Sequence, residues 1–61
     1  MYVIMNKYNN TFYKEHYAAN MNVWTMNIDK ARTFSTPADA YNHAYNNDIL
    51  RNDIIVVDKY N

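Results

Sequence analysis

Short blocks of hydrophobic residues alternate with polar residues along the chain, and the first two blocks predict a hairpin. The β-branched and aromatic residues of Tyr2–Met5 are typical of a strand, and so is the Thr-, Phe- and Tyr-rich stretch Thr11–Tyr17. Between them, Tyr8-Asn9-Asn10 is suited to a tight turn, because Asn tolerates a positive φ better than most residues do. The pattern therefore predicts an N-terminal β-hairpin.

The middle of the chain predicts a third strand followed by a short irregular stretch. The strand covers Asn22–Met26, after a connector at residues 18–20. A single helical turn is expected over Asn27–Ala31, with Asp29 as its cap, and a short extended piece over Arg32–Phe34. This stretch carries the chain from the sheet toward a helix.

The clearest local signal is a helix start at residues 36–39. Thr36 is suited to the N-cap, Pro37 to the first helical position, and Asp39 to the first turn, where a carboxylate favours the positive end of the helix dipole. The helix is predicted to run from Pro37 to Asn46 or Asn47, where Asn can end it in the left-handed conformation.

Helical spacing predicts which side of this helix packs on the sheet. The expected apolar stripe faces Trp24 and Phe34 and leaves His43 pointing away with its neighbours Asn42 and Asn46. Its members are Ala38, Tyr41, Ala44 and Tyr45.

The last apolar block, Asp53–Lys59, predicts a fourth strand, after residues 48–52, which form a connector or a frayed extra turn. Its run of four β-branched residues favours a strand covered on both faces or central in the sheet. The expected order is β-β-β-α-β in a single domain, residues 1–61. The fold class is α+β, a small and mainly antiparallel sheet with one helix packed on one face.

Composition narrows the function by exclusion. Six basic residues balance six acidic ones, which disfavours a binder that depends on bulk positive charge. Cys and Gly are both absent, which excludes disulfides, thiolate metal sites and glycine-built phosphate loops. We find neither a signal peptide nor a membrane-spanning stretch in the pattern, so the expected location is the cytoplasm, that of a bacterial host.

The sequence offers little for catalysis or metal binding. The two histidines, His16 and His43, have no short ligand spacing, and we expect both to lie on the surface. Ser35 is the one serine, and it precedes the helix cap. We therefore expect a protein that is not an enzyme and that uses neither a metal nor a cofactor.

Aromatic residues give the strongest functional hint, since ten of the 61 residues are Phe, Trp or Tyr. A core this small accommodates about half of them, so several tyrosines should be exposed. Exposed Tyr and Asn are typical of adaptable protein-binding surfaces, although AT-rich codon bias explains the same enrichment equally well. The candidate protein-binding residues lie on the hairpin: Tyr8, Asn9, Asn10, Tyr13 and Tyr17.

The same hairpin leaves a second interpretation open. Lys7 and Lys14 could neighbour each other across it, with Tyr8, Tyr13 and Tyr17 as stacking platforms for single-stranded nucleic acid. Zero net charge disfavours this alternative, because neutralising phosphates supplies most non-specific affinity. A small nucleic-acid-binding accessory or regulatory protein is therefore the second hypothesis.

The stretch from Trp24 to Ala44 contains a spaced set of residues: Trp24-Thr25, Ile28, Lys30-Ala31, Phe34, Thr36, Ala40 and Ala44. This set resembles a pattern found in small phage-encoded accessory proteins, among them anti-CRISPR inhibitors. The resemblance implies a compact β-rich fold and a binding role directed at a bacterial host or defence complex, with no catalytic residue. Because so small a core gives little stability alone, we also expect a homodimer, formed through a sheet edge or an aromatic face.

Overall fold

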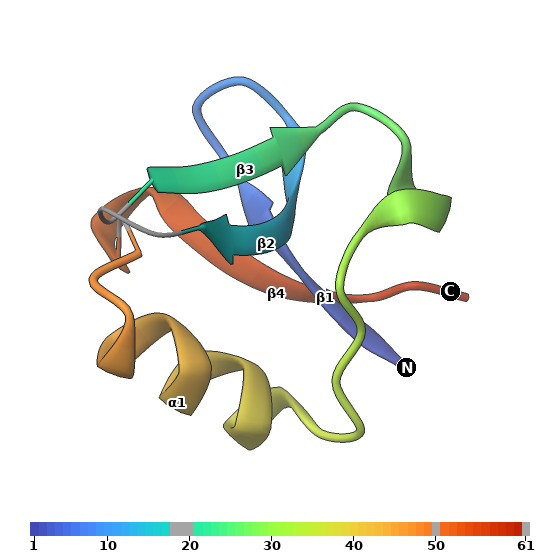
Figure 1. The fold of residues 1–61 in the computed structure, drawn as a ribbon. Coiled ribbons are helices and arrows are strands. Elements are labelled where there is room, and N and C mark those ends of the chain that lie inside the picture. Colours follow the sequence, from blue (N-terminus) through green and yellow to red (C-terminus); the bar gives the residue numbers. More distant parts are fainter. Residues whose placement is uncertain (18–20, 50, 61) are drawn as a thin grey trace.

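A computed structural model describes the backbone of residues 1–17, 21–49 and 51–60, and the side chains of residues 1–14, 24–49 and 52–60. The expected connector at residues 18–20 lies outside the described residues. Within them, the chain forms a four-stranded antiparallel sheet with one α-helix across it (Figure 1). The elements are β1 (Tyr2–Asn6), β2 (Thr11–Tyr17), β3 (Met21–Thr25), the 3-10 turn η1 (Ile28–Lys30), α1 (Pro37–Asn46), the 3-10 turn η2 (Arg51–Asp53) and β4 (Ile54–Asp58).

The expected fold class and element order are confirmed. The sheet order is β3-β2-β1-β4, so the two hairpins occupy three adjacent strands and the chain then crosses to the far side of β1. The crossing passes through η1 and α1, and α1 contacts both β1 and β4. This path places the helix over one face of the sheet, as Figure 1 shows.

β4 is an edge strand, which corrects the expectation that its apolar run marks a central or fully covered strand. Within the described part of the chain it pairs only with β1, from Tyr2↔Asp58 to Asn6↔Ile54, and Ile55 is exposed. The strands with described neighbours on both sides are β1 and β2, and Val3 and Ile4 of β1 are fully buried. A run of β-branched residues thus indicates a strand here without indicating its place in the sheet.

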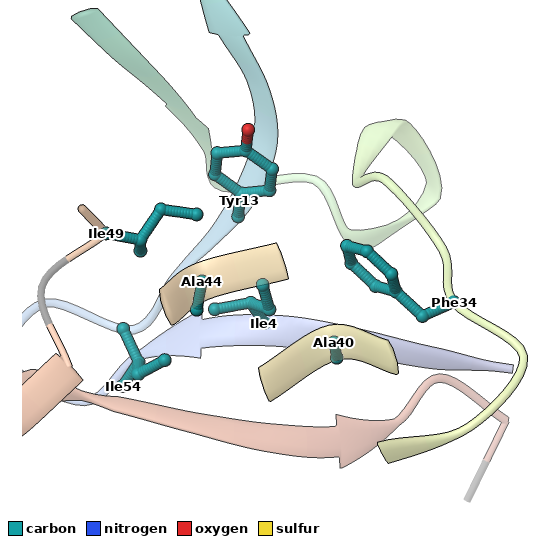
Figure 2. Packing of buried hydrophobic residues seen from close by; sticks show 7 residues of the cluster. All are labelled: Ile4, Tyr13, Phe34, Ala40, Ala44, Ile49 and Ile54. Carbon is teal, nitrogen blue, oxygen red and sulfur yellow. The ribbon is translucent and has the colours of Figure 1, made fainter. Parts of the chain in front are cut away.

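The main core lies between the sheet and α1. Ile4 of β1 and Tyr13 of β2 meet Ala40 and Ala44 of α1, and Phe34 closes one side of the cluster (Figure 2). Ile49 and Ile54 complete the buried set, and Trp24 packs against it. Phe34 reaches this position because its backbone forms a bridge with Tyr2, through two hydrogen bonds of 2.8 and 2.9 Å.

The helix begins as predicted, and its packed face differs from the prediction. The Thr36 hydroxyl accepts a hydrogen bond from the Asp39 backbone N–H at 3.1 Å, and Pro37 occupies the first turn. The buried positions are Ala40 and Ala44, with His43 half-buried beside them.

The expected apolar stripe was therefore wrong, because a different side of the helix packs on the sheet. Ala38, Tyr41 and Tyr45 are exposed, and only Ala44 of the four expected residues is buried. The physical reason is size: alanine lets the helix backbone approach the sheet, whereas a tyrosine at the same position would hold it away. The helix ends at Asn46, and the positive φ near its end falls at Asp48 rather than at Asn46 or Asn47.

The sheet face opposite α1 carries a smaller buried region. Val3 is fully buried although its neighbours in sequence face the helix, and Ala31, just after η1, is buried too. The η1 turn lies near the end of β4, where Asp29 Oδ1 is 3.9 Å from Lys59 Nζ. Its cap is Asn27, whose side chain accepts from the Asp29 N–H at 2.9 Å, so the expectation that Asp29 caps this turn was wrong.

Candidate binding surface

The turn that joins β1 to β2, hereafter the Lys7–Asn10 turn, is held by side chains at its two ends. At its start, Asn6 is buried and its Oδ1 accepts from the Tyr8 N–H at 2.9 Å, while its backbone carbonyl accepts from the Asn10 N–H at 2.8 Å. The Lys7 N–H donates to the carbonyl of Asp53 at 2.7 Å, which ties the turn to the start of β4. The first half of the turn is therefore fixed to the sheet.

The second half of the turn is closed by Asn9 and Asn10. Asn9 Oδ1 accepts from both the N–H and the hydroxyl of Thr11, at 3.2 and 2.6 Å. Asn10 takes φ 60°, the positive value expected of an Asn in this turn. Asn9 thus uses its carbonyl oxygen to shape the turn, which leaves Tyr8 as the large side chain that the turn presents.

Tyr8 has the most exposed large side chain among the described hydrophobic residues, at 88%. Lys7, Asn9 and Asn10 beside it are exposed as well. A flat aromatic ring on a backbone fixed by hydrogen bonds loses little conformational freedom when it is covered by a partner. The structure therefore brings Tyr8, Asn9 and Asn10 together at one exposed tip.

Tyr13 lies in the core, so its expected place on a binding surface was wrong. Its side chain is fully buried, and its ring meets that of Trp24 edge-on at 5.9 Å between centroids. The hydroxyl finds a partner in His43 Nε2 at 3.1 Å, which satisfies the phenol inside the protein. A tyrosine with a buried partner for its hydroxyl acts as a core residue.

The strand pairing also departs from the regular alternation on which the expected alignment of Tyr13 with Tyr17 was based. The pairing of β2 with β3 shifts between Tyr13 and Glu15, so the strict two-residue alternation is interrupted there. The Tyr17 side chain lies outside the described residues. Of the basic residues invoked for the nucleic-acid alternative, Lys7 and Lys14 are exposed, but the burial of Tyr13 removes one of its stacking platforms.

His43 is a packing residue, contrary to the expectation that it points to solvent. Its ring lies 5.4 Å from that of Tyr13 and 5.3 Å from that of Phe34, between centroids. The side chain of His16 falls outside the described part of the chain. Among the described residues, no group of three or more potential ligands is placed to hold a metal ion.

The outward side of α1 forms a second aromatic surface that the sequence interpretation missed. Tyr41 and Tyr45 are one helical turn apart and are 48% and 64% exposed. Figure 1 places α1 and the Lys7–Asn10 turn at opposite ends of the view, so these tyrosines lie on a different part of the fold from the turn that carries Tyr8. The sequence signal that could have predicted their exposure is the spacing of Ala40 and Ala44, which marks a different packed side for the helix.

No family model, curated protein or solved structure matches this chain. Among the described residues, no helix is long and apolar enough to cross a membrane.

Proposed function

We propose that this chain is a non-enzymatic protein of a phage or mobile element that binds and inhibits a bacterial host or defence complex, such as a CRISPR-type effector. The observation that carries the proposal is the exposure of Tyr8 on a turn whose backbone is fixed by Asn6 and Asn9. Aromatic anchors of this kind dominate the affinity of many protein interfaces.

Rigidity and exposure act together in this proposal. Exposed tyrosines on mobile segments lose conformational entropy on binding, at about 0.5–1.5 kcal/mol per ordered side chain. In this chain the backbone at Tyr8 is already ordered, because the Asn6 side chain accepts a hydrogen bond from the Tyr8 N–H. The partner then covers a preformed tip, and Lys7, Asn9 and Asn10 form the polar rim around it.

The test is a phage-challenge assay in bacteria that carry a CRISPR-type defence against that phage. Expression of the chain should restore plaque formation, and Tyr8→Ala should abolish that effect, because loss of a central anchor costs about 2 kcal/mol or more of binding. Tyr41→Ala is the matched control, since it removes another exposed tyrosine from a different surface. Failure of the unaltered chain to restore plaques across a panel of defence types would reject the inhibitor proposal.

A titration with single-stranded DNA separates this proposal from the nucleic-acid alternative. We expect little binding at either of two salt concentrations, about 50 and 200 mM. The chain has no net positive charge with which to displace counterions from the DNA phosphates. Tight binding that collapses at the higher salt concentration, and that weakens in Lys7→Ala and Lys14→Ala, would favour the alternative instead.

A further inference from the structure

The backbone groups along the outer side of β4 follow from its pairing with β1. Two hydrogen bonds at the ends of this pairing, from Lys7 N–H to Asp53 and from Lys59 N–H to Met1, show which residues direct their backbone N–H and C=O toward β1. In an antiparallel pair the inward residues alternate, so Ile55 and Val57 also direct their N–H and C=O toward β1. Ile54, Val56 and Asp58 direct theirs away from the sheet.

This outer side, hereafter the β4 edge, has few of the features that protect edge strands from pairing. Natural edges carry a proline, a bulge or charged side chains within the strand. β4 has neither a proline nor a bulge, its pairing with β1 is regular throughout, and its one charged side chain, Asp58, is its last residue. Ile55, on the face opposite α1, is also exposed. An edge of this kind is a template for another strand.

We propose that the β4 edge pairs antiparallel with the β4 edge of a second copy of this chain, joining the two sheets into one. A two-fold axis at Val56 places Val56 opposite Val56 of the second copy and Ile54 opposite Asp58. The same register places exposed Ile55 opposite Val57 on the face away from α1. The inference stands apart from the proposed function, because it uses no residue of the Lys7–Asn10 turn.

Charge complementarity selects this register. With Val56 at the axis, Asp53 of each copy lies opposite Lys59 of the other, in a pair without backbone hydrogen bonds, where side chains approach most closely. Moving the axis to Ile55 places Asp53 opposite Val57, and moving it to Val57 places Lys59 opposite Ile55. Asp53 is exposed, and Lys59, whose side chain is 14% exposed, has its Nζ 3.9 Å from the exposed carboxylate of Asp29 and 5.4 Å from the centre of the Tyr60 ring.

Charge reversal tests the register directly. We expect Asp53→Lys to weaken the dimer by about tenfold or more, because it creates two like-charged pairs, and Lys59→Asp to do the same. An equimolar mixture of the two variants should dimerise again, since both pairs are then of opposite charge. Lys14→Asp changes the net charge as Lys59→Asp does, but lies on β2, away from the β4 edge, and should leave the dimer intact.

The measurement is sedimentation velocity over a concentration series from about 5 to 500 µM, which covers the range expected for a small interface. Circular dichroism confirms that each variant is folded. A monomer at every concentration, or a dimer that survives both reversals, would overturn the proposal.

Amide hydrogen exchange on the unaltered chain gives a test that needs no variant. Protection of the Val56 amide should rise with concentration, because pairing covers it, whereas that of Ile55, already directed toward β1, should stay constant. Concentration-dependent protection confined to β3 would place the dimer at the opposite edge and overturn the proposal as well.

Discussion

The two faces of α1 differ more in side-chain size than in polarity, and size decides which face packs. The face on the sheet carries Ala40 and Ala44 with His43 beside them, whereas the outward face carries Tyr41 and Tyr45. A count of hydrophobic residues alone would predict that the face with the tyrosines packs on the sheet. Close packing against a sheet favours the alanines, because each leaves room for side chains such as Ile4. The larger aromatic rings of Tyr41 and Tyr45 remain partly exposed.

Removal of Phe34 should break the inner face most severely. Phe34→Ala should lower the free energy of unfolding by about 3–5 kcal/mol, close to the whole stability of so small a domain, because the ring packs in the core and against His43. Thermal unfolding followed by circular dichroism measures the effect. A variant that remains folded at about 37 °C would show that Phe34 contributes little to the core.

Enlarging the inner face tests the size argument itself. Ala44→Leu should cost about 1–3 kcal/mol of unfolding free energy, although leucine is more hydrophobic than alanine, because there is no space for it beneath the helix. Ala38→Leu makes the same change at an exposed position of the same helix and should shift stability by about 0.5 kcal/mol or less. Equal effects in urea unfolding would contradict the assignment of faces.

The N-cap at Thr36 fixes where the helix begins. Thr36→Ala should remove about 1 kcal/mol, since the Asp39 N–H loses its acceptor, and should lower the melting midpoint by about 4–8 °C. Ser35→Ala, at the exposed residue next to it, serves as the control. A shift of less than about one degree would mean that the cap adds nothing to the stability of the helix.

Truncation on the outward face should have the smallest effect. Tyr41→Ala should change the free energy of unfolding by about 0.5 kcal/mol or less, because its side chain is half exposed. Chemical denaturation provides the measurement. A loss above about 1 kcal/mol would assign Tyr41 a packing role and would blur the distinction between the faces.

Local signals in the sequence predicted the elements well. The two asparagines before Thr11 indicated the first turn, and Thr36-Pro37 indicated the helix start, because each acts on its own backbone within a few residues. The strands β1 and β2 followed from their β-branched and aromatic residues. Of the candidate site, the exposed tip at Tyr8, Asn9 and Asn10 was found in the same way.

Features that depend on distant parts of the chain were not predictable in this way. The burial of Tyr13 depends on His43, thirty residues away, whose ring supplies the partner for the hydroxyl. The position of β4 at the edge depends on which side of β1 the chain reaches after α1. Neither relation leaves a periodic trace in the sequence. The interpretation therefore offered Tyr13 both as a core candidate and as a binding residue, and expected β4 to be central or covered on both faces.

The absence of glycine has a consequence for the unfolded chain. Among the residues that the structure describes, Asn10 and Asp48 take positive φ values of 60° and 53° with a side chain present, at a cost of up to about 1–2 kcal/mol each. Glycine would remove that cost, but it would also widen the range of conformations that the unfolded backbone explores. With a Cβ atom on every residue, this chain has less conformational entropy to lose on folding, which offsets the strain at its two turns.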